Sequence, residues 1–174
     1  SSRACREIEI CNLLFEVYNT TMIKTIIFNL GGVYFTDGTK HAINRIALEY
    51  SLKPQTVADV LQGELGSQYR MGEITGDRFW FEAKKIWRIN APSQDLANIW
   101  LSGYTPIHGT IDILDSLKIK GYELLFMSDN VKERVEYLQE KYHFLGFFKD
   151  GIFSHLAHSK KPDPKIYQLV LTLA

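Results

Sequence analysis

Cysteine, net charge and long hydrophobic runs are all scarce in this sequence of 174 residues. Its two cysteines, Cys5 and Cys11, match neither a zinc-finger nor a redox spacing, and two thiols make no disulfide framework. The 20 basic and 20 acidic residues cancel, which removes the electrostatic reason to expect nucleic acid or an anionic membrane as a partner. Glu7, Glu9 and Glu16 interrupt the apolar start, so we expect no signal peptide, and no segment approaches the length of a membrane span. We therefore expect a protein of a reducing compartment, the cytoplasm.

What the sequence does contain is an alternation of strand and helix patterns. Ile23–Leu30, Tyr122–Met127 and Gly151–Phe153 are short apolar runs, which indicate buried strands. A helix ended by Gly121 precedes the second run, and Pro164 lies in the segment that opens a last helix after the third. Strands that alternate with helices predict a parallel sheet with right-handed crossovers. The expected fold class is therefore α/β, a Rossmann-like three-layer arrangement.

Between the first two strand runs the sequence shows only helical periodicity. Pro54 suits the first position of one helix, and Thr75 and Ser93 are suitable N-caps for two others. Together with a helix before them, these predict four helices in an inserted module. Three tryptophans could line a substrate pocket there, but their helical spacing favours core packing: Trp80, Trp87 and Trp100.

These patterns divide the chain into three parts. We expect an N-terminal extension over residues 1–21, an α/β core over 22–38 and 104–174, and a helical module over 39–103. Residues 3–18 fit both helical and strand periodicity, and we favour a helix. In the core, the run Lys132-Glu133-Arg134 is expected on the solvated face of a helix.

Polar side chains gather where the expected strands end. Asn29 with Gly31-Gly32, Ser128 with Asp129-Asn130, and Lys161 each follow a strand, and in open α/β sheets ligands bind beyond the carboxyl ends of the strands. Glycines let backbone N–H groups approach an anion, and a hydroxyl and an ammonium would complete a pocket for a phosphoryl group. Each cluster alone would be read as a turn. Their common location favours a site.

At this point the sequence resembles a known family, the haloacid dehalogenase-like (HAD) hydrolases. IIFNLGGVYF resembles the first HAD motif, in which Asn29 stands where Asp is usual; LLFMSDN resembles the second and SKKPDPKIY the third. MGEITGDRFW and IWLSGYTPIHG resemble the helical cap of the phosphatase-type branch. The resemblance runs from about Ile23 to the last residue.

The resemblance implies a phosphoaspartyl mechanism, in which the first Asp attacks phosphorus and water hydrolyses the intermediate. The implied catalytic positions are Asn29, Ser128 and Lys161, and Mg²⁺ would be held by Asn29 and the carbonyl of Gly31. The substrate would be a small phosphorylated metabolite, or the ligand inorganic phosphate. The implied phosphate-binding residues are Gly31, Gly32, Ser128, Asn130 and Lys161.

The sequence departs from the family pattern in three places, of which the first and third oppose turnover; the second, Leu-Gly-Gly, also occurs in family members regarded as hydrolases. Asn29 offers a neutral amide, which is a poor nucleophile and a weak metal ligand, and Gly31 stands where many relatives place an acid/base Asp. The sequence given ends at Ala174, before any fourth-motif carboxylate. We expect a phosphatase-type HAD protein that does not turn over and binds Mg²⁺ weakly or not at all. The alternatives are a non-catalytic phosphate-binding or interaction protein on this scaffold and, last, a haloacid dehalogenase, which still needs the Asp.

The resemblance also implies an open sheet edge. In the family the first-motif strand lies between the second-motif and fourth-motif strands, so Ile23–Leu30 would have an unpaired apolar side here. Such an edge pairs readily with another strand. We expect either that the segment from Ile8 to Val17 covers this edge or that the protein self-associates through it.

Overall fold

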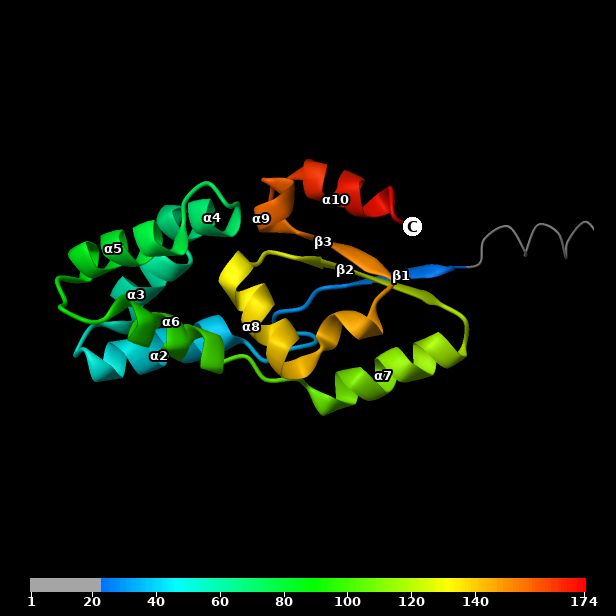
Figure 1. Ribbon diagram of the computed structural model, residues 1–174, viewed down its shortest axis with the longest axis horizontal. Helices are drawn as coiled ribbons and strands as arrows, with labels where there is room; N and C mark the ends of the chain where they lie inside the picture. Colours follow the sequence, from blue (N-terminus) through cyan, green and yellow to red (C-terminus); the bar gives the residue numbers. More distant parts are fainter. Residues whose placement is uncertain (1–22) are drawn as a thin grey trace, which may run out of the picture.

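The computed structural model describes residues 23–174, so the expectations for the N-terminal extension lie outside the described residues (Figure 1). Three strands form one parallel sheet in the order β1-β2-β3. They are β1 (Thr25–Phe28), β2 (Glu123–Ser128) and β3 (Asp150–Phe153). The predicted pairing of the first two strands is confirmed, with Phe28 opposite Phe126, although β1 is shorter than the apolar run that predicts it.

Helices cover both faces of this sheet, which confirms the three-layer α/β fold (Figure 1). On one face lie α7 (His108–Ile119) and α8 (Lys132–Tyr142), and on the other lies α10 (Pro164–Leu171). The short helices η1 (Phe144–Phe147) and α9 (Ser154–Ala157) flank β3 in the sequence. None of the helices in residues 23–174 is both long and apolar enough to cross a membrane.

The middle strand, β2, contributes a run of buried side chains to the core, because helices cover both of its faces. Leu124, Leu125 and Phe126 are all buried. Gly151 of β3 lies directly under the ring of Phe126, where any Cβ would clash with that ring. A glycine at this point therefore allows a bulky aromatic side chain to lie over the neighbouring strand.

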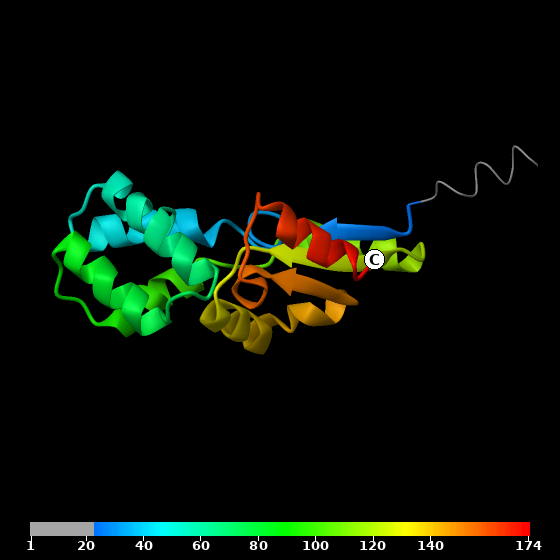
Figure 2. The ribbon, with the colours of Figure 1, turned by 90° about the horizontal axis from the view of Figure 1, so that it is seen from above.

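A module of five helices, α2 to α6, lies beyond the carboxyl ends of the strands (Figure 2). Only four helices were predicted: α4 was missed because it has seven residues, too few to show helical periodicity. Thr75 caps α5 as predicted, by accepting a hydrogen bond from Arg78 N–H at 3.3 Å. Ser93 does not cap α6, because Pro92 holds the cap position and Ser93 is the first helical residue. The five helices are α2 (Gly38–Glu49), α3 (Pro54–Leu61), α4 (Glu64–Arg70), α5 (Gly76–Trp87) and α6 (Ser93–Ser102).

Aromatic rings fill the interior of this helical module. Trp80, Trp87 and Trp100 are 4%, 3% and 2% exposed, so the expectation of core packing is confirmed for all three. Phe79 stacks on both Trp100 and Tyr69, at centroid distances of 5.8 and 4.7 Å. Such rings bury large apolar areas, and they form the module's part of a hydrophobic core that continues to the sheet.

Hydrogen bonds at two places join the helical module to the rest of the protein. The two linkers that join it to the core lie side by side, with Thr36 N–H donating to the Thr105 carbonyl at 2.9 Å and Thr105 N–H to Thr36 Oγ1 at 3.0 Å. At the other end of the module, Ser154 Oγ donates to the Arg70 carbonyl at 2.6 Å, and His158 Nδ1 to the Met71 carbonyl at 2.9 Å.

Candidate functional site

A cavity of about 400 Å³ lies at the carboxyl ends of β1 and β2, between the sheet and the helical module. We call it the strand-end cavity. Five of the six residues predicted for a site line it: Asn29, Gly31, Gly32, Ser128 and Lys161. The cavity is also lined by Asp129, which the sequence placed in a strand-end cluster without a role, and by residues that the sequence did not single out as a site: Asp37, Thr39, Gln62, Arg70, Tyr104 and Arg134.

The amide of Asn29 is held on both sides. Lys161 Nζ donates to Asn29 Oδ1 at 2.7 Å, and Asn29 Nδ2 donates to the carbonyl oxygen of Gly31 at 2.7 Å. The chemistry of the partners fixes the orientation, because an ammonium can only donate and a carbonyl can only accept. Asn29 therefore directs its NH₂ group at the carbonyl that the family resemblance assigns to a metal.

Lys161 and Ser128 supply a cation and a hydroxyl to the same cavity. Lys161 Nζ is also 3.3 Å from the Met127 carbonyl, and burial lowers the pKa of Lys161, an effect that the charge of Asp129 opposes. Ser128 is 2% exposed, yet its hydroxyl lines the cavity and has no hydrogen-bond partner within residues 23–174. Both groups are positioned to contact an anion.

The two glycines differ in what they offer a ligand. Gly32 has φ +76°, and its N–H donates to the Phe35 carbonyl at 2.7 Å. That bond closes the turn after β1, so the predicted phosphate contact cannot come from this N–H. The N–H of Gly31 has no acceptor within the described part of the chain and remains available.

Asn130, the sixth predicted residue, lies outside the strand-end cavity. Its Oδ1 accepts hydrogen bonds from Val131 N–H, at 3.1 Å, and from the Nε of Arg134. The side chain is 5% exposed and is directed at α8. Asn130 therefore positions Arg134, and the structure gives it no direct path to a ligand in this cavity.

Arg134 corrects the expectation of a solvated helix face, because it is 2% exposed. It lies three residues after Val131 and four before Leu138, both buried, so it shares their face of α8. Its guanidinium lies 4.7 and 4.6 Å from the ring centroids of Trp100 and Tyr104, and donates to Tyr104 Oη at 2.5 Å. The helical spacing of these apolar neighbours was the sequence signal for its burial.

Arg70 brings a second guanidinium to the cavity from the end of α4. Its Nη1 donates to the Leu61 carbonyl at 2.8 Å. Burial, and after it the charge of Arg134, lower the pKa of Arg70, while Asp129 opposes them. Within residues 23–174, neither arginine has a carboxylate within the 4.0 Å of a salt bridge. Two neighbouring guanidinium groups with no close counter-ion favour an anion in the cavity.

The oxygen atoms of this site do not fit Mg²⁺ in the arrangement described. The two predicted metal ligands, Asn29 Oδ1 and the Gly31 carbonyl, each accept a hydrogen bond already. Asp37 Oδ1 accepts from Lys40 N–H at the start of α2, and Asp129 Oδ1 accepts from Lys161 N–H, so each of these carboxylates keeps only one oxygen for a ligand. Nor do residues 23–174 hold a group of three or more His, Cys, Asp or Glu side chains that could bind a metal ion.

Comparison with known proteins identifies the family. Residues 35–174 match the sequence profile of the haloacid dehalogenase-like hydrolases. The chain belongs to this family. The match begins after Asn29, so the role of that position in this HAD chain rests on its motif and its contacts. An uncharacterised protein of Dictyostelium discoideum is 26% identical, over 80% of this chain and 62% of that protein, so the chain spans less than two thirds of this relative.

Solved structures of HAD proteins share the fold. A HAD family enzyme from Bacteroides thetaiotaomicron superposes with a TM-score of 0.70 at 18% identity, covering 86% of this chain and 77% of that one. The same enzyme has been solved in complex with magnesium and inorganic phosphate. L-2-haloacid dehalogenase from Xanthobacter autotrophicus superposes with a TM-score of 0.59 at 16% identity, over 87% of this chain and 65% of that one.

Proposed function

We propose that this HAD chain binds inorganic phosphate or a small phosphorylated metabolite in the strand-end cavity and does not hydrolyse it. The observation that carries the proposal is the amide of Asn29, held between Lys161 Nζ and the Gly31 carbonyl. We also propose residues 39–103 as the cap over this site and the flanking segments as its core.

Anion binding follows from the charges of the cavity. Lys161, Arg70 and Arg134 bring three positive charges, against two carboxylates from Asp37 and Asp129. A phosphate that accepts hydrogen bonds from Lys161, Ser128 and the Gly31 N–H would gain charge-assisted bonds. Phosphate binding by the Bacteroides relative supports this assignment, as does a mutant of that protein, with one aspartate replaced by alanine, in complex with magnesium and inorganic phosphate.

Lack of turnover follows from the amide at position 29. A carboxylate oxygen can attack phosphorus and form an acyl phosphate, which water then hydrolyses to release phosphate and the carboxylate. An amide oxygen is a weak nucleophile, and here it already accepts from Lys161. The side chain of Gly31 is a hydrogen atom, so the family's acid/base group is missing at that position too. Dehalogenation by the family's mechanism needs the same carboxylate at position 29.

The test is a phosphate titration followed by ³¹P NMR or calorimetry, with and without Mg²⁺. We expect saturable binding that neither Mg²⁺ nor EDTA changes, and no release of p-nitrophenol from p-nitrophenyl phosphate. Lys161→Ala should weaken binding by about tenfold or more, because a hydrogen bond to a charged group is worth about 1.5–3 kcal/mol. Lys160→Ala is the matched control, since Lys160 does not line the cavity.

Asn29→Asp should make phosphate binding depend on Mg²⁺. A carboxylate beside the phosphate would repel it, so affinity in EDTA should fall below that of the unchanged chain, and Mg²⁺ should restore part of it. Robust hydrolysis by the unchanged chain, or phosphate binding that survives Lys161→Ala intact, would overturn the proposal.

A further inference from the structure

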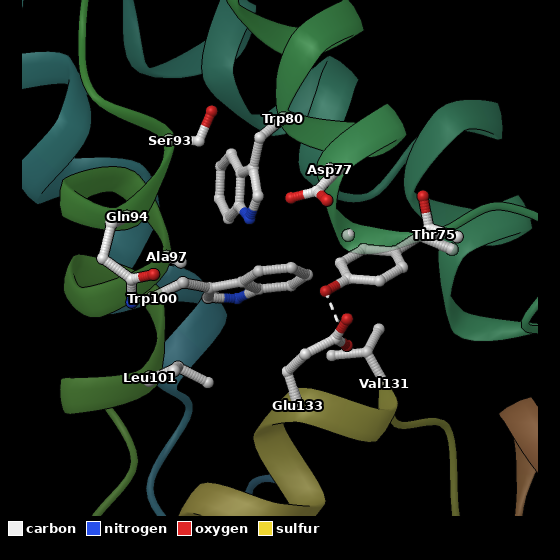
Figure 3. Close-up of a pocket in the computed structure, with 12 residues that line it drawn as sticks. Thr75, Asp77, Trp80, Ser93, Gln94, Ala97, Trp100, Leu101, Val131 and Glu133 are labelled. Atoms are coloured by element: carbon white, nitrogen blue, oxygen red, sulfur yellow. Dashed lines mark hydrogen bonds between the residues drawn. The ribbon is translucent and has the colours of Figure 1, made fainter.

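A second cavity, of about 220 Å³, lies between the helical module and the start of α8 (Figure 3). We call it the aromatic cavity. None of the residues that line it lines the strand-end cavity. Its walls are three aromatic rings, and its polar groups include two carboxylates, Asp77 and Glu133. The full set is Tyr69, Thr75, Gly76, Asp77, Trp80, Ser93, Gln94, Ala97, Trp100, Leu101, Val131 and Glu133.

One polar group in this cavity lacks a partner. Trp80 is 4% exposed, and its indole N–H has no acceptor within residues 23–174. By contrast, Trp87 Nε1 donates to the Thr56 carbonyl at 3.2 Å and Trp100 Nε1 donates to Thr39 Oγ1 at 3.1 Å. Figure 3 shows the Trp80 nitrogen on the side of its ring toward Trp100 and Asp77. The Trp80 nitrogen is not among the buried side-chain atoms that lack a partner, so its N–H is accessible from the cavity, where a ligand can accept a hydrogen bond from it.

The carboxylates limit what that ligand can be. Asp77 and Glu133 line the cavity with no lysine or arginine among its lining residues, so an anion would be repelled. Glu133 Oε2 already accepts from the Tyr69 hydroxyl at 2.8 Å, which leaves its other oxygen for a ligand donor. The ligand must therefore donate hydrogen bonds to the carboxylates and accept one from Trp80.

A quaternary or primary ammonium meets only half of this requirement, because it has no acceptor. Arg134, which does not line the cavity, already places its guanidinium over the Trp100 ring, 4.7 Å from the centroid. A second cation at the same ring would meet that positive charge. Hydroxyl groups both donate and accept, so a neutral ligand rich in hydroxyls fits the polar groups better.

The aromatic walls select the shape of the ligand. The rings of Trp80 and Trp100 are perpendicular, with an interplanar angle of 90° and centroids 5.8 Å apart. The C–H groups of a sugar can contact the parts of these rings that face the cavity, while its hydroxyls reach the Trp80 N–H and the carboxylates. The volume of the aromatic cavity equals that of roughly seven water molecules at about 30 Å³ each. A cavity of this size has room for a ligand with one small ring. We propose that the aromatic cavity binds a neutral monosaccharide.

The indole N–H signals of a ¹⁵N-labelled sample test this proposal directly. We expect one of the methyl glycosides of D-glucose, D-galactose and D-mannose to shift the Trp80 signal saturably at millimolar concentration. The Trp87 signal should stay in place as an internal control, because its N–H already has an acceptor outside this cavity. No saturable shift with any of the three would overturn the proposal, leaving water as the partner of Trp80.

Substitutions at the cavity distinguish the binding of a sugar from the binding of a cation. Trp80→Phe keeps a ring but loses the donor, so saturation-transfer NMR should report binding about three- to tenfold weaker; Trp87→Phe, the same change outside the cavity, should leave it unchanged. Asp77→Asn keeps a hydrogen-bonding group, so sugar affinity should change by a few-fold at most. Saturable binding of choline that Asp77→Asn abolishes would instead assign the cavity to a cation and overturn the proposal. The phosphate titrations test the strand-end cavity separately, so either proposal can fail alone.

Discussion

Lys161 is the residue on which both the geometry and the charge of the strand-end cavity depend. Its backbone N–H donates to Asp129 Oδ1 at 3.1 Å, and its ammonium reaches past the end of β2 to Asn29 at the end of β1. The ammonium is half-buried, and burial lowers the pKa of Lys161 because water stabilises the charged form less well there. The site therefore holds a lysine whose proton is released at a lower pH than that of an exposed lysine.

That pKa makes anion binding dependent on pH. A bound anion favours the ammonium form, so affinity is highest below the pKa of Lys161 and falls as pH rises through it. Sulfate is the probe, because it does not titrate in the alkaline range. We expect its affinity to begin to fall at a pH below the usual lysine range, near 10.4, and to have fallen by about tenfold or more once Lys161 is neutral. Calorimetric titrations at increasing pH measure this.

Two variants serve as controls for this pH dependence. Lys161→Arg keeps its charge at high pH, so the decline should disappear, whereas Lys160→Arg should retain it. A decline of the same size and midpoint in Lys161→Arg would assign the pH dependence to another group.

Helices α4 and α8 each contribute neighbouring residues to the two cavities. Tyr69 and Glu133 line the aromatic cavity, and the residues that follow them, Arg70 and Arg134, line the strand-end cavity. The hydrogen bond from Tyr69 to Glu133 joins the two helices between these pairs. Burial, and after it the bond to Glu133, raise the pKa of Tyr69, so its phenol keeps the proton that makes this bond.

Ser154 joins the end of α4 to the segment before α8 through two hydrogen bonds. Its side chain is fully buried, and its Oγ accepts from Asn130 N–H at 2.9 Å while donating to the Arg70 carbonyl at 2.6 Å. Ser154→Ala would leave a buried donor and a buried acceptor without partners, so we expect it to lower the free energy of unfolding by about 1–3 kcal/mol. Urea denaturation measures the loss. Ser116→Ala, at an exposed position of α7, is the control, and equal unfolding midpoints for the two variants would contradict this role.

Local patterns in the sequence predicted the strands, most helices and the set of strand-end residues, because period, caps and glycines act within a few residues. They could not predict Arg70, since α4 is too short to show a period and the partner of Arg70, the Leu61 carbonyl, belongs to another helix. Nor could they show that the N–H of Gly32 makes a hydrogen bond to the carbonyl of Phe35, because that bond depends on how the turn after β1 closes. The direction of the Asn130 side chain depends likewise on Arg134, which lies in the following helix.

At the scale of the whole molecule, the outer edge of β1 is the feature that bears on self-association. Within residues 23–174, β1 is the end strand of the sheet, paired with β2 alone. None of its four residues is fully buried, and Ile27 is 36% exposed, whereas the middle strand has three adjacent buried residues. An apolar end strand with free N–H and C=O groups pairs readily with another strand.

We predict that the segment from Ile8 to Val17 covers this edge, or that a second copy of the chain does. Deleting residues 1–21 should then lower solubility or the free energy of unfolding, and sedimentation should show self-association that grows with protein concentration. Ile27→Lys in the shortened chain should reduce that association, because a charged side chain on an end strand opposes pairing. Leu48→Lys, at a 78% exposed position of α2, is the control and should not reduce it. If the full chain also associates and Ile27→Lys disperses it, the second copy is the cover. A shortened chain that stays monomeric, soluble and equally stable would refute the prediction, since the β1 edge would then need no cover.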